Sequence, residues 1–120
     1  MFILIIVFFS ATSLLCYNDI GDRGWDAVRS AFSQMTSLTS LNVAHNPRAS
    51  SQCWTAFLTD LPKLPSPLQH LHIAFNNVGE LGCQALITAC RTIQSLTSLC
   101  MYVADIPHSG YQALCDAARE

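Results

Sequence analysis

The chain has 120 residues, a length that suits one compact domain. Hydrophobic residues make up 51% of it and charged residues 12%, so the composition excludes a disordered chain. The formal net charge is −2 and the six lysines and arginines are scattered, which excludes the clustered basic surface that nucleic-acid binding needs.

Residues 1–13 form an apolar N-terminal segment, most strongly between Phe2 and Phe9. Its length suits the hydrophobic region of a signal peptide and falls short of the roughly 20 residues of a membrane-spanning helix. However, a signal peptide typically has a positively charged residue before its apolar region, and no lysine or arginine precedes this apolar run. We interpret the segment as signal-like or anchor-like, or as an imperfect start, and place one array over residues 14–120.

The array is defined by a repeated pattern of leucines that ends in asparagine. The pattern LxxLxLxxN recurs over residues 38–46, 68–76 and 96–104, with Ala104 in the last asparagine position. A weaker copy ends at Asn18 and has serines in two leucine positions. The anchor positions 18, 46, 76 and 104 are 28, 30 and 28 residues apart, so we predict four copies of one structural unit.

Each unit is predicted to form a strand, a turn, a helix and a return loop. The alternating apolar pair before an anchor, such as Leu41 and Val43, is typical of a short strand whose two side chains point inward. Glycine stands six positions after the first, third and fourth anchors, and we expect it just before the helix. Apolar residues at helical spacing predict helices over residues 25–32 and 84–90. The second return loop, residues 60–67, holds three prolines and two extra residues.

This pattern resembles the ribonuclease-inhibitor-like class of leucine-rich repeats, which occurs also in NOD-like receptors and in GTPase activators of Ran. The resemblance covers the chain from about Leu14 to Ala118. It implies an α/β fold, a leucine-rich-repeat solenoid or horseshoe segment of about four strand–turn–helix repeats with a parallel sheet on its concave side. The sequence contains no GxxxxGK[ST] loop, so the nucleotide-binding module of NOD-like receptors is not expected here.

Side chains that flank the inward pair on each strand are expected to face the concave surface. They are Ser40, Asn42 and Ala44; His70, His72 and Ala74; and Ser98, Cys100 and Tyr102. A rigid sheet presents such rows to a partner. The candidate binding residues are Asn42, His70, His72, Cys100 and Tyr102. The alternative is that these are ordinary solvated positions without a ligand.

Two kinds of site chemistry could arise on this surface. His70, His72 and Cys100 could supply three ligands to a metal ion, and Cys100 beside His72 could form a nucleophile–base pair. Neither arrangement has a carboxylate in register to complete it. We therefore expect no metal site, no cofactor and no catalytic residues.

Asn18, Asn46 and Asn76 are expected to form a structural ladder that bonds backbone groups of the turns and of neighbouring repeats. The six cysteines lie mostly in apolar segments and show no CxxC spacing. We expect reduced, buried thiols, with disulfides or metal ligands as the alternative.

The predicted function is a scaffold that binds another protein through the concave sheet face. The repeats lack polar caps, so we expect them to be part of a larger array or to be covered by a partner. An intracellular, cytoplasmic location is favoured. The alternatives are a secreted or membrane-anchored recognition protein, if residues 1–13 act as signal or anchor, and an enzyme with a Cys/His site.

Overall fold

The computed structural model describes residues 12–14, 20–101 and 108–118, and strands alternate with helices along them. The strands are β1 (Thr12–Leu14), β2 (Ser40–Asn42), β3 (His70–His72) and β4 (Ser98–Cys100). The helices are α2 (Asp22–Ser30), α3 (Ser51–Asp60), α4 (Gly79–Thr92) and α5 (His108–Ala118), and two 3₁₀ turns, η1 (Phe32–Gln34) and η2 (Leu61–Lys63), follow α2 and α3.

The four strands form one parallel sheet in the order β1-β2-β3-β4. Thr12 pairs with Ser40, Ser40 with His70, and His70 with Ser98. These partners are 28, 30 and 28 residues apart, the same offsets as the asparagine anchors. The pattern of leucines and asparagines in the sequence thus coincides with the pairing register of the sheet.

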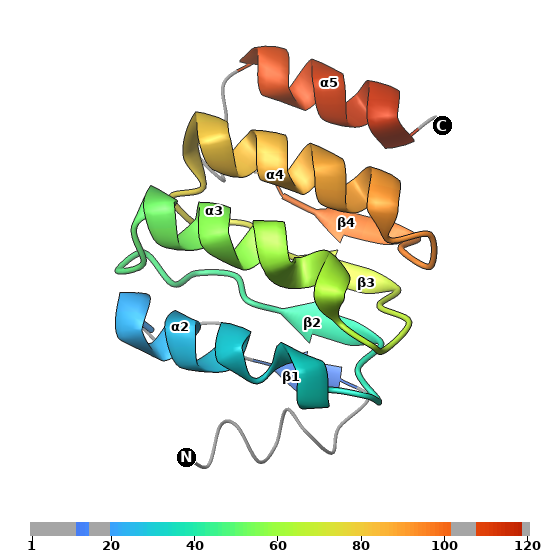
Figure 1. Cartoon of the computed structure of the whole chain (residues 1–120). Helices are drawn as coiled ribbons and strands as arrows, with labels where there is room; N and C mark the ends of the chain where they lie inside the picture. The colour runs from blue at the N-terminus through green and yellow to red at the C-terminus, as the bar shows by residue number, and fades with distance from the viewer. Residues whose placement is uncertain (1–11, 15–19, 102–107, 119–120) are drawn as a thin grey trace.

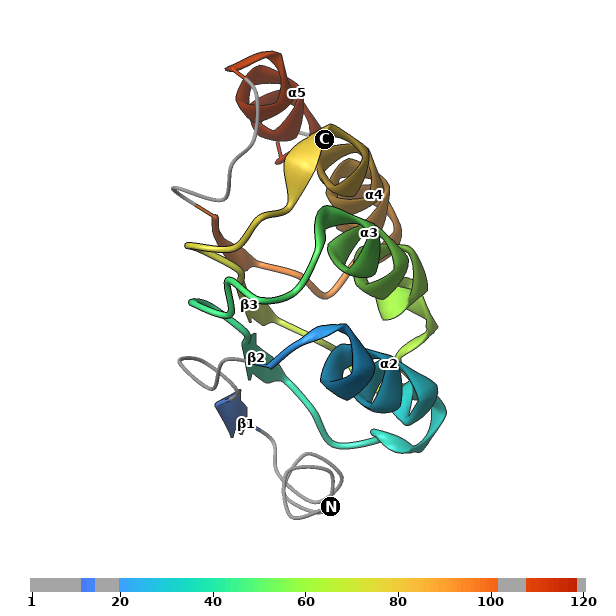
Figure 2. The same cartoon turned by 90° about the vertical axis from the view of Figure 1, so that its left-hand side faces the viewer.

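All the labelled helices lie on one side of the sheet, stacked in chain order (Figure 1). Figure 2 shows the strands along one side of the molecule and the helices along the other. A parallel strand pair needs a crossover, and right-handed crossovers of similar length place every helix on the same face. The described part of the chain is therefore an α/β repeat fold with one helix-covered and one uncovered sheet face.

The sheet begins earlier than the array boundary expected from the sequence. That boundary was residue 14, whereas β1 runs from Thr12 to Leu14 and pairs along its length with β2. Residues 1–11 lie outside the described part of the chain. None of the described helices combines the length and the apolar character of a membrane-spanning segment. The division at residues 13 and 14 stays a prediction.

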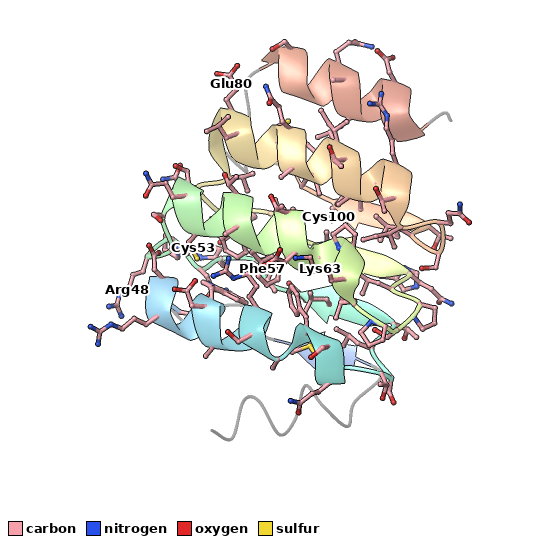
Figure 3. All side chains as sticks on the ribbon, viewed as in Figure 1. Arg48, Cys53, Phe57, Lys63, Glu80 and Cys100 are labelled. Atoms are coloured by element: carbon pink, nitrogen blue, oxygen red, sulfur yellow. The ribbon has the colours of Figure 1, made fainter. Side chains whose placement is uncertain are left out.

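The core lies between the helices and the sheet. Leu41 and Leu71 at the centres of β2 and β3 are 2% exposed, because alternation along a strand turns every second side chain to the helix side. From the helices, Trp25, Trp54 and Phe57 fill the space between α2 and α3, with ring centroids 5.0–5.4 Å apart. Figure 3 shows Phe57 between these two helices. Tilted and edge-on rings at this spacing add stability beyond their buried area.

The recurring glycines lie within the first helical turns, not before them as expected. A Cβ on Gly24 would approach Ile20 Cγ2 to 2.6 Å, and a Cβ on Gly82 would approach Val78 Cγ1 to 2.7 Å. Glycine is therefore required by close packing against an apolar residue one turn earlier.

Two buried asparagines join the second and third repeats at the end of the strands. The Asn46 N–H donates to Asn76 Oδ1 at 2.7 Å, and Asn76 Nδ2 donates to the carbonyls of Val43 and Ile73. Asn46 repeats the pattern one unit earlier: its Nδ2 donates to the Val43 carbonyl and its Oδ1 accepts from Ile20 N–H. These bonds satisfy backbone groups that would be buried without partners. Asn18 and Ala104 lie outside the described residues.

Replacing Asn76→Ala is expected to lower the free energy of unfolding by about 3 kcal/mol or more. The substitution leaves the Asn46 N–H and two carbonyls with fewer partners, and each buried unsatisfied group costs about 1–3 kcal/mol. Urea denaturation followed by circular dichroism measures the change. The matched control is Asn77→Ala, at the exposed neighbouring position, which should change stability by no more than about 0.5 kcal/mol. Equal losses in the two variants would contradict the role of the ladder.

Candidate functional site

The face of the sheet opposite the helices carries the candidate binding residues. We define the sheet face by the outward side chains of β2, β3 and β4, which are Ser40, Asn42, His70, His72, Ser98 and Cys100. His70 and Ser98 are exposed and the other four are half-buried. Four of the five predicted binding residues, Asn42, His70, His72 and Cys100, are thus brought together on one surface. Tyr102 lies outside the described residues.

Side chains of the sheet face form two rows across the strands. Asn42, His72 and Cys100 are register partners, as are Ser40, His70 and Ser98. Neighbouring strands in a sheet are about 4.8 Å apart, so each imidazole on β3 lies between small side chains on β2 and β4. Two histidines therefore stand out along the middle of an otherwise small and polar surface.

Ala44 and Ala74 do not belong to this surface, although the sequence pattern placed them there. Their exposed fractions are 3% and 0%. The strands end at Asn42 and His72, so the alternation of inward and outward side chains no longer applies two residues later. The chain turns there, and each small methyl group is covered.

The turn after each central strand contains a residue with left-handed backbone. His45 has φ 61° and Phe75 has φ 59°, and their rings lie 5.2 Å apart at an angle of 35°. The two residues directly precede the ladder asparagines, so this turn geometry aims the asparagine side chains back at the strands. Phe75 is 37% exposed, and a bulky residue in this backbone region is uncommon.

At position 75, glycine is expected to give a more stable protein than alanine. Left-handed backbone costs an L-residue about 1–2 kcal/mol and costs glycine little, whereas at ordinary positions alanine is favoured by about 0.4–1 kcal/mol. Thermal unfolding of Phe75→Gly and Phe75→Ala measures the order directly, since both variants lose the same ring. A more stable Phe75→Ala variant would show that the turn relaxes.

His72 and Cys100 are side by side, but the geometry does not complete a catalytic or metal site. His72 Nε2 is buried and has no hydrogen-bond partner among the described residues. Within the same part of the chain, no group of three or more histidine, cysteine or acidic side chains could hold a metal ion. Strands β2, β3 and β4 carry no carboxylate that could orient the imidazole.

Four cysteines fall within the described side chains, and all four are free: Cys53, Cys83, Cys90 and Cys100. Cys53, Cys83 and Cys90 belong to the helical layer. Burial raises the pKa of Cys53 to about 11, and the nearby carboxylates of Asp22 and Asp26 add to this shift. Burial also raises the pKa of Cys83 and of Cys90. A thiol with a raised pKa is mostly protonated near neutral pH and is therefore a poor nucleophile, because the thiolate is the reactive form.

Stability is expected to fall as the pH rises above about 9. The unfolded Cys53 thiol loses its proton near its ordinary pKa of 9.0, while the folded thiol keeps it up to about 11. The folded state then binds more protons, so the free energy of unfolding decreases through this window, by roughly 2 kcal/mol for this group. Urea denaturation across the window measures the slope. Cys53→Ala should reduce the slope, to which Cys83 and Cys90 still contribute, and an unchanged slope would contradict the assignment.

A polar contact that the sequence pattern did not reveal joins the starts of α2 and α3. Asp22 accepts hydrogen bonds from the Ser50 N–H at 2.8 Å and from its hydroxyl at 2.7 Å. Ser50 Oγ in turn accepts from the Cys53 N–H and caps α3. The backbone bond from Ser50, followed by its hydroxyl, lowers the pKa of Asp22. This contact fixes adjacent repeats on the side of the array opposite the sheet face.

Two hollows of about 290 Å³ lie away from the sheet face. One lies between the second and third return loops, and its lining includes Leu64, Ser66 and Ile93. The other lies beside the exposed Leu81, between the first turns of α3 and α4. Neither is lined by a residue of the sheet face.

Comparison with known families supports the repeat. A family model described as "Leucine Rich repeat" matches residues 34–47 and 65–86, which include β2, β3 and their turns. These two segments of the chain are therefore similar to leucine-rich repeats. Repeats of this kind are generally protein-interaction scaffolds.

A similarity in overall fold covers more of the chain than the family model matches. A solved structure titled "Leiomodin-1 Actin-Binding Site 2 (ABS2)" is similar over 97% of this chain and 68% of its own, with a TM-score of 0.75 and 13% sequence identity. No curated protein matches the chain significantly in sequence.

Proposed function

We propose that these leucine-rich repeats form a scaffold that binds a partner protein across the sheet face. The observation that carries the proposal is the side of the parallel sheet that the described helices leave uncovered (Figure 2). On this side, the outward side chains of β2, β3 and β4 are aligned by the pairing register. About four repeats of the ribonuclease-inhibitor-like class, with this face concave, form part of the proposal. Their place in a larger array remains an expectation.

The frame behind the sheet face is rigid. Leu41 and Leu71 anchor the strands in the core, and the Asn46–Asn76 bonds join the ends of the strands. A surface held in this way loses little conformational freedom when a partner binds. Asn42, His70, His72 and Cys100 are the proposed contacts, and Tyr102 is retained as a fifth on sequence grounds.

The described sheet face suits a protein better than a small molecule. Small ligands generally need an enclosed, mostly apolar cavity, whereas the two hollows lie elsewhere. The structural relative's title names actin binding. At 13% identity this likeness concerns the fold, so actin serves here as a partner to be tested.

Site-specific photocrosslinking tests the proposal. A photoreactive amino acid introduced at His70 or Ser98 should give the same adduct with the partner protein in cell extract. The same group at Gln84 or Thr88, exposed positions on α4, should give none, because the helices face away from the partner. Purified actin, added alone, tests that partner directly. Adducts that form equally from α4 and from the strands would contradict binding by the sheet face.

A further inference from the structure

The parallel sheet ends at β4, whose outer edge has no neighbouring strand among the described residues. Figure 1 shows α5 further along the stack than this strand. An edge strand presents a row of backbone N–H and C=O groups that can pair with another chain. The edge of β4 is therefore a different surface from the sheet face, because its binding groups belong to the backbone.

Backbone hydrogen bonds from one repeat to the next form a row of donors that stops at β4. The Val43 N–H donates to the His72 carbonyl, and the Ile73 N–H donates to the Cys100 carbonyl at 2.8 Å. Met101 occupies the same position in the following repeat. Its N–H has no acceptor in the described part of the chain, so this donor is open to a further strand.

A row of acceptors stops in the same way. The Thr39 carbonyl accepts from the Gln69 N–H at 2.7 Å, and the Gln69 carbonyl accepts from the Thr97 N–H at 2.9 Å. The Thr97 carbonyl is next in this row and has no donor within the described residues. Leu99 lies midway between Thr97 and Met101, and the alternation of a parallel strand directs its N–H and C=O to the same outer edge.

Apolar side chains of β4 are less well covered than those of β3. Leu71 and Ile73 are 2% and 0% exposed, whereas Leu99 and Met101, at the same positions in the next repeat, are half-buried. In a solenoid each repeat is covered partly by its neighbour. Apolar surface is therefore left beside β4, where a fifth strand would lie.

The sequence around β4 lacks the features that normally protect an edge strand. Natural edge strands carry charged side chains, prolines or bulges that discourage pairing. Between Arg91 and Asp105 the chain contains no charged residue and no proline. Both the backbone and the side chains of this edge thus permit another strand to pair with it.

We propose that the outer edge of β4 binds an extended segment of a partner protein, which adds to the sheet as a further strand. Donors and acceptors that alternate along this edge match those of a strand and of no other backbone conformation. Alternate side chains of the segment are apolar and lie on the helix side, beside Leu99 and Met101. This contact goes beyond the proposed function and does not depend on the sheet face.

A single strand suits this edge better than a second copy of the chain. Helix α5 extends beyond β4 in the stacking direction (Figure 1), and the buried Leu114 anchors it to the core. Two copies joined at their β4 edges would place both α5 helices over the shared pair of strands. An extended segment carries no helix and avoids this overlap.

Fluorescence anisotropy with the full chain and a labelled peptide tests this inference. The peptide copies residues 96–101 with serine in place of Cys100, because β4 itself pairs with a neighbouring strand. Two matched peptides carry N-methyl groups on alternate residues, each along one edge of the strand. Methylation of the edge that bonds to β4 should weaken binding by about tenfold or more, because several hydrogen bonds are lost. Methylation of the other edge should leave binding nearly unchanged.

Two variants at Met101 test the same edge from the side of the protein. Met101→Pro removes the open N–H, and proline is tolerated on an edge strand where its nitrogen faces outward. Met101→Ala also loses the methionine side chain but keeps the N–H. The alanine variant should therefore bind the peptide about fivefold more tightly than the proline variant. Circular dichroism establishes that both variants are folded.

Equal binding of the two methylated peptides, or equal binding by the two Met101 variants, would overturn the inference. A peptide that does not bind would also overturn it, including the case in which the chain self-associates through β4. None of these results affects the crosslinks expected from the sheet face. Loss of strand-specific crosslinks would instead remove the proposed function and leave this inference intact.

Discussion

The stacking of Asn76 on Asn46 is the interaction on which the rest of the structure depends. Strands of three residues offer few ladder bonds of their own, and a parallel pair of that length is weak by itself. The amide of Asn76 reaches both its own strand and the Val43 carbonyl of the preceding repeat. One side chain therefore fixes the rise from the second repeat to the third, and with it the alignment of β2 and β3.

This constraint explains why the turns tolerate unfavourable backbone. His45 and Phe75 both adopt positive φ, a conformation that normally favours glycine. The asparagine that follows must enter the interior immediately after the strand, and the tight turn makes this possible. The free energy of the buried hydrogen bonds exceeds the local strain, because three backbone groups are satisfied by one Asn76 side chain.

The sequence predicted the pairing register of the strands and missed where the strands end, where the recurring glycines lie, and which side chains meet between elements. The register followed from the spacing of leucines and asparagines, because one repeat must stack on the next. The burial of Ala44 and Ala74 was missed, since a pattern of alternation cannot show where a strand ends. The contact between Asp22 and Ser50 was missed too, because it joins unlike residues in two different repeats.

The second repeat shows how such positions depend on one another. Gly24 packs against Ile20, and Gly82 packs against Val78, too closely for a side chain at the glycine. The second repeat has Gln52 in the glycine position and Arg48 in the apolar one, and both are exposed. In this repeat the glycine is replaced by the longer Gln52, and the apolar residue that would pack against it is replaced by Arg48.

No comparable coupling constrains the sheet face. His70 and His72 alternate with Leu71, which alone of the three is fully turned into the core. Neither imidazole takes part in the asparagine bonds or belongs to the buried apolar core. The chemistry presented to a partner is therefore separable from the interactions that hold the repeats together. This separation allows a repeat array to acquire a new partner without a new fold.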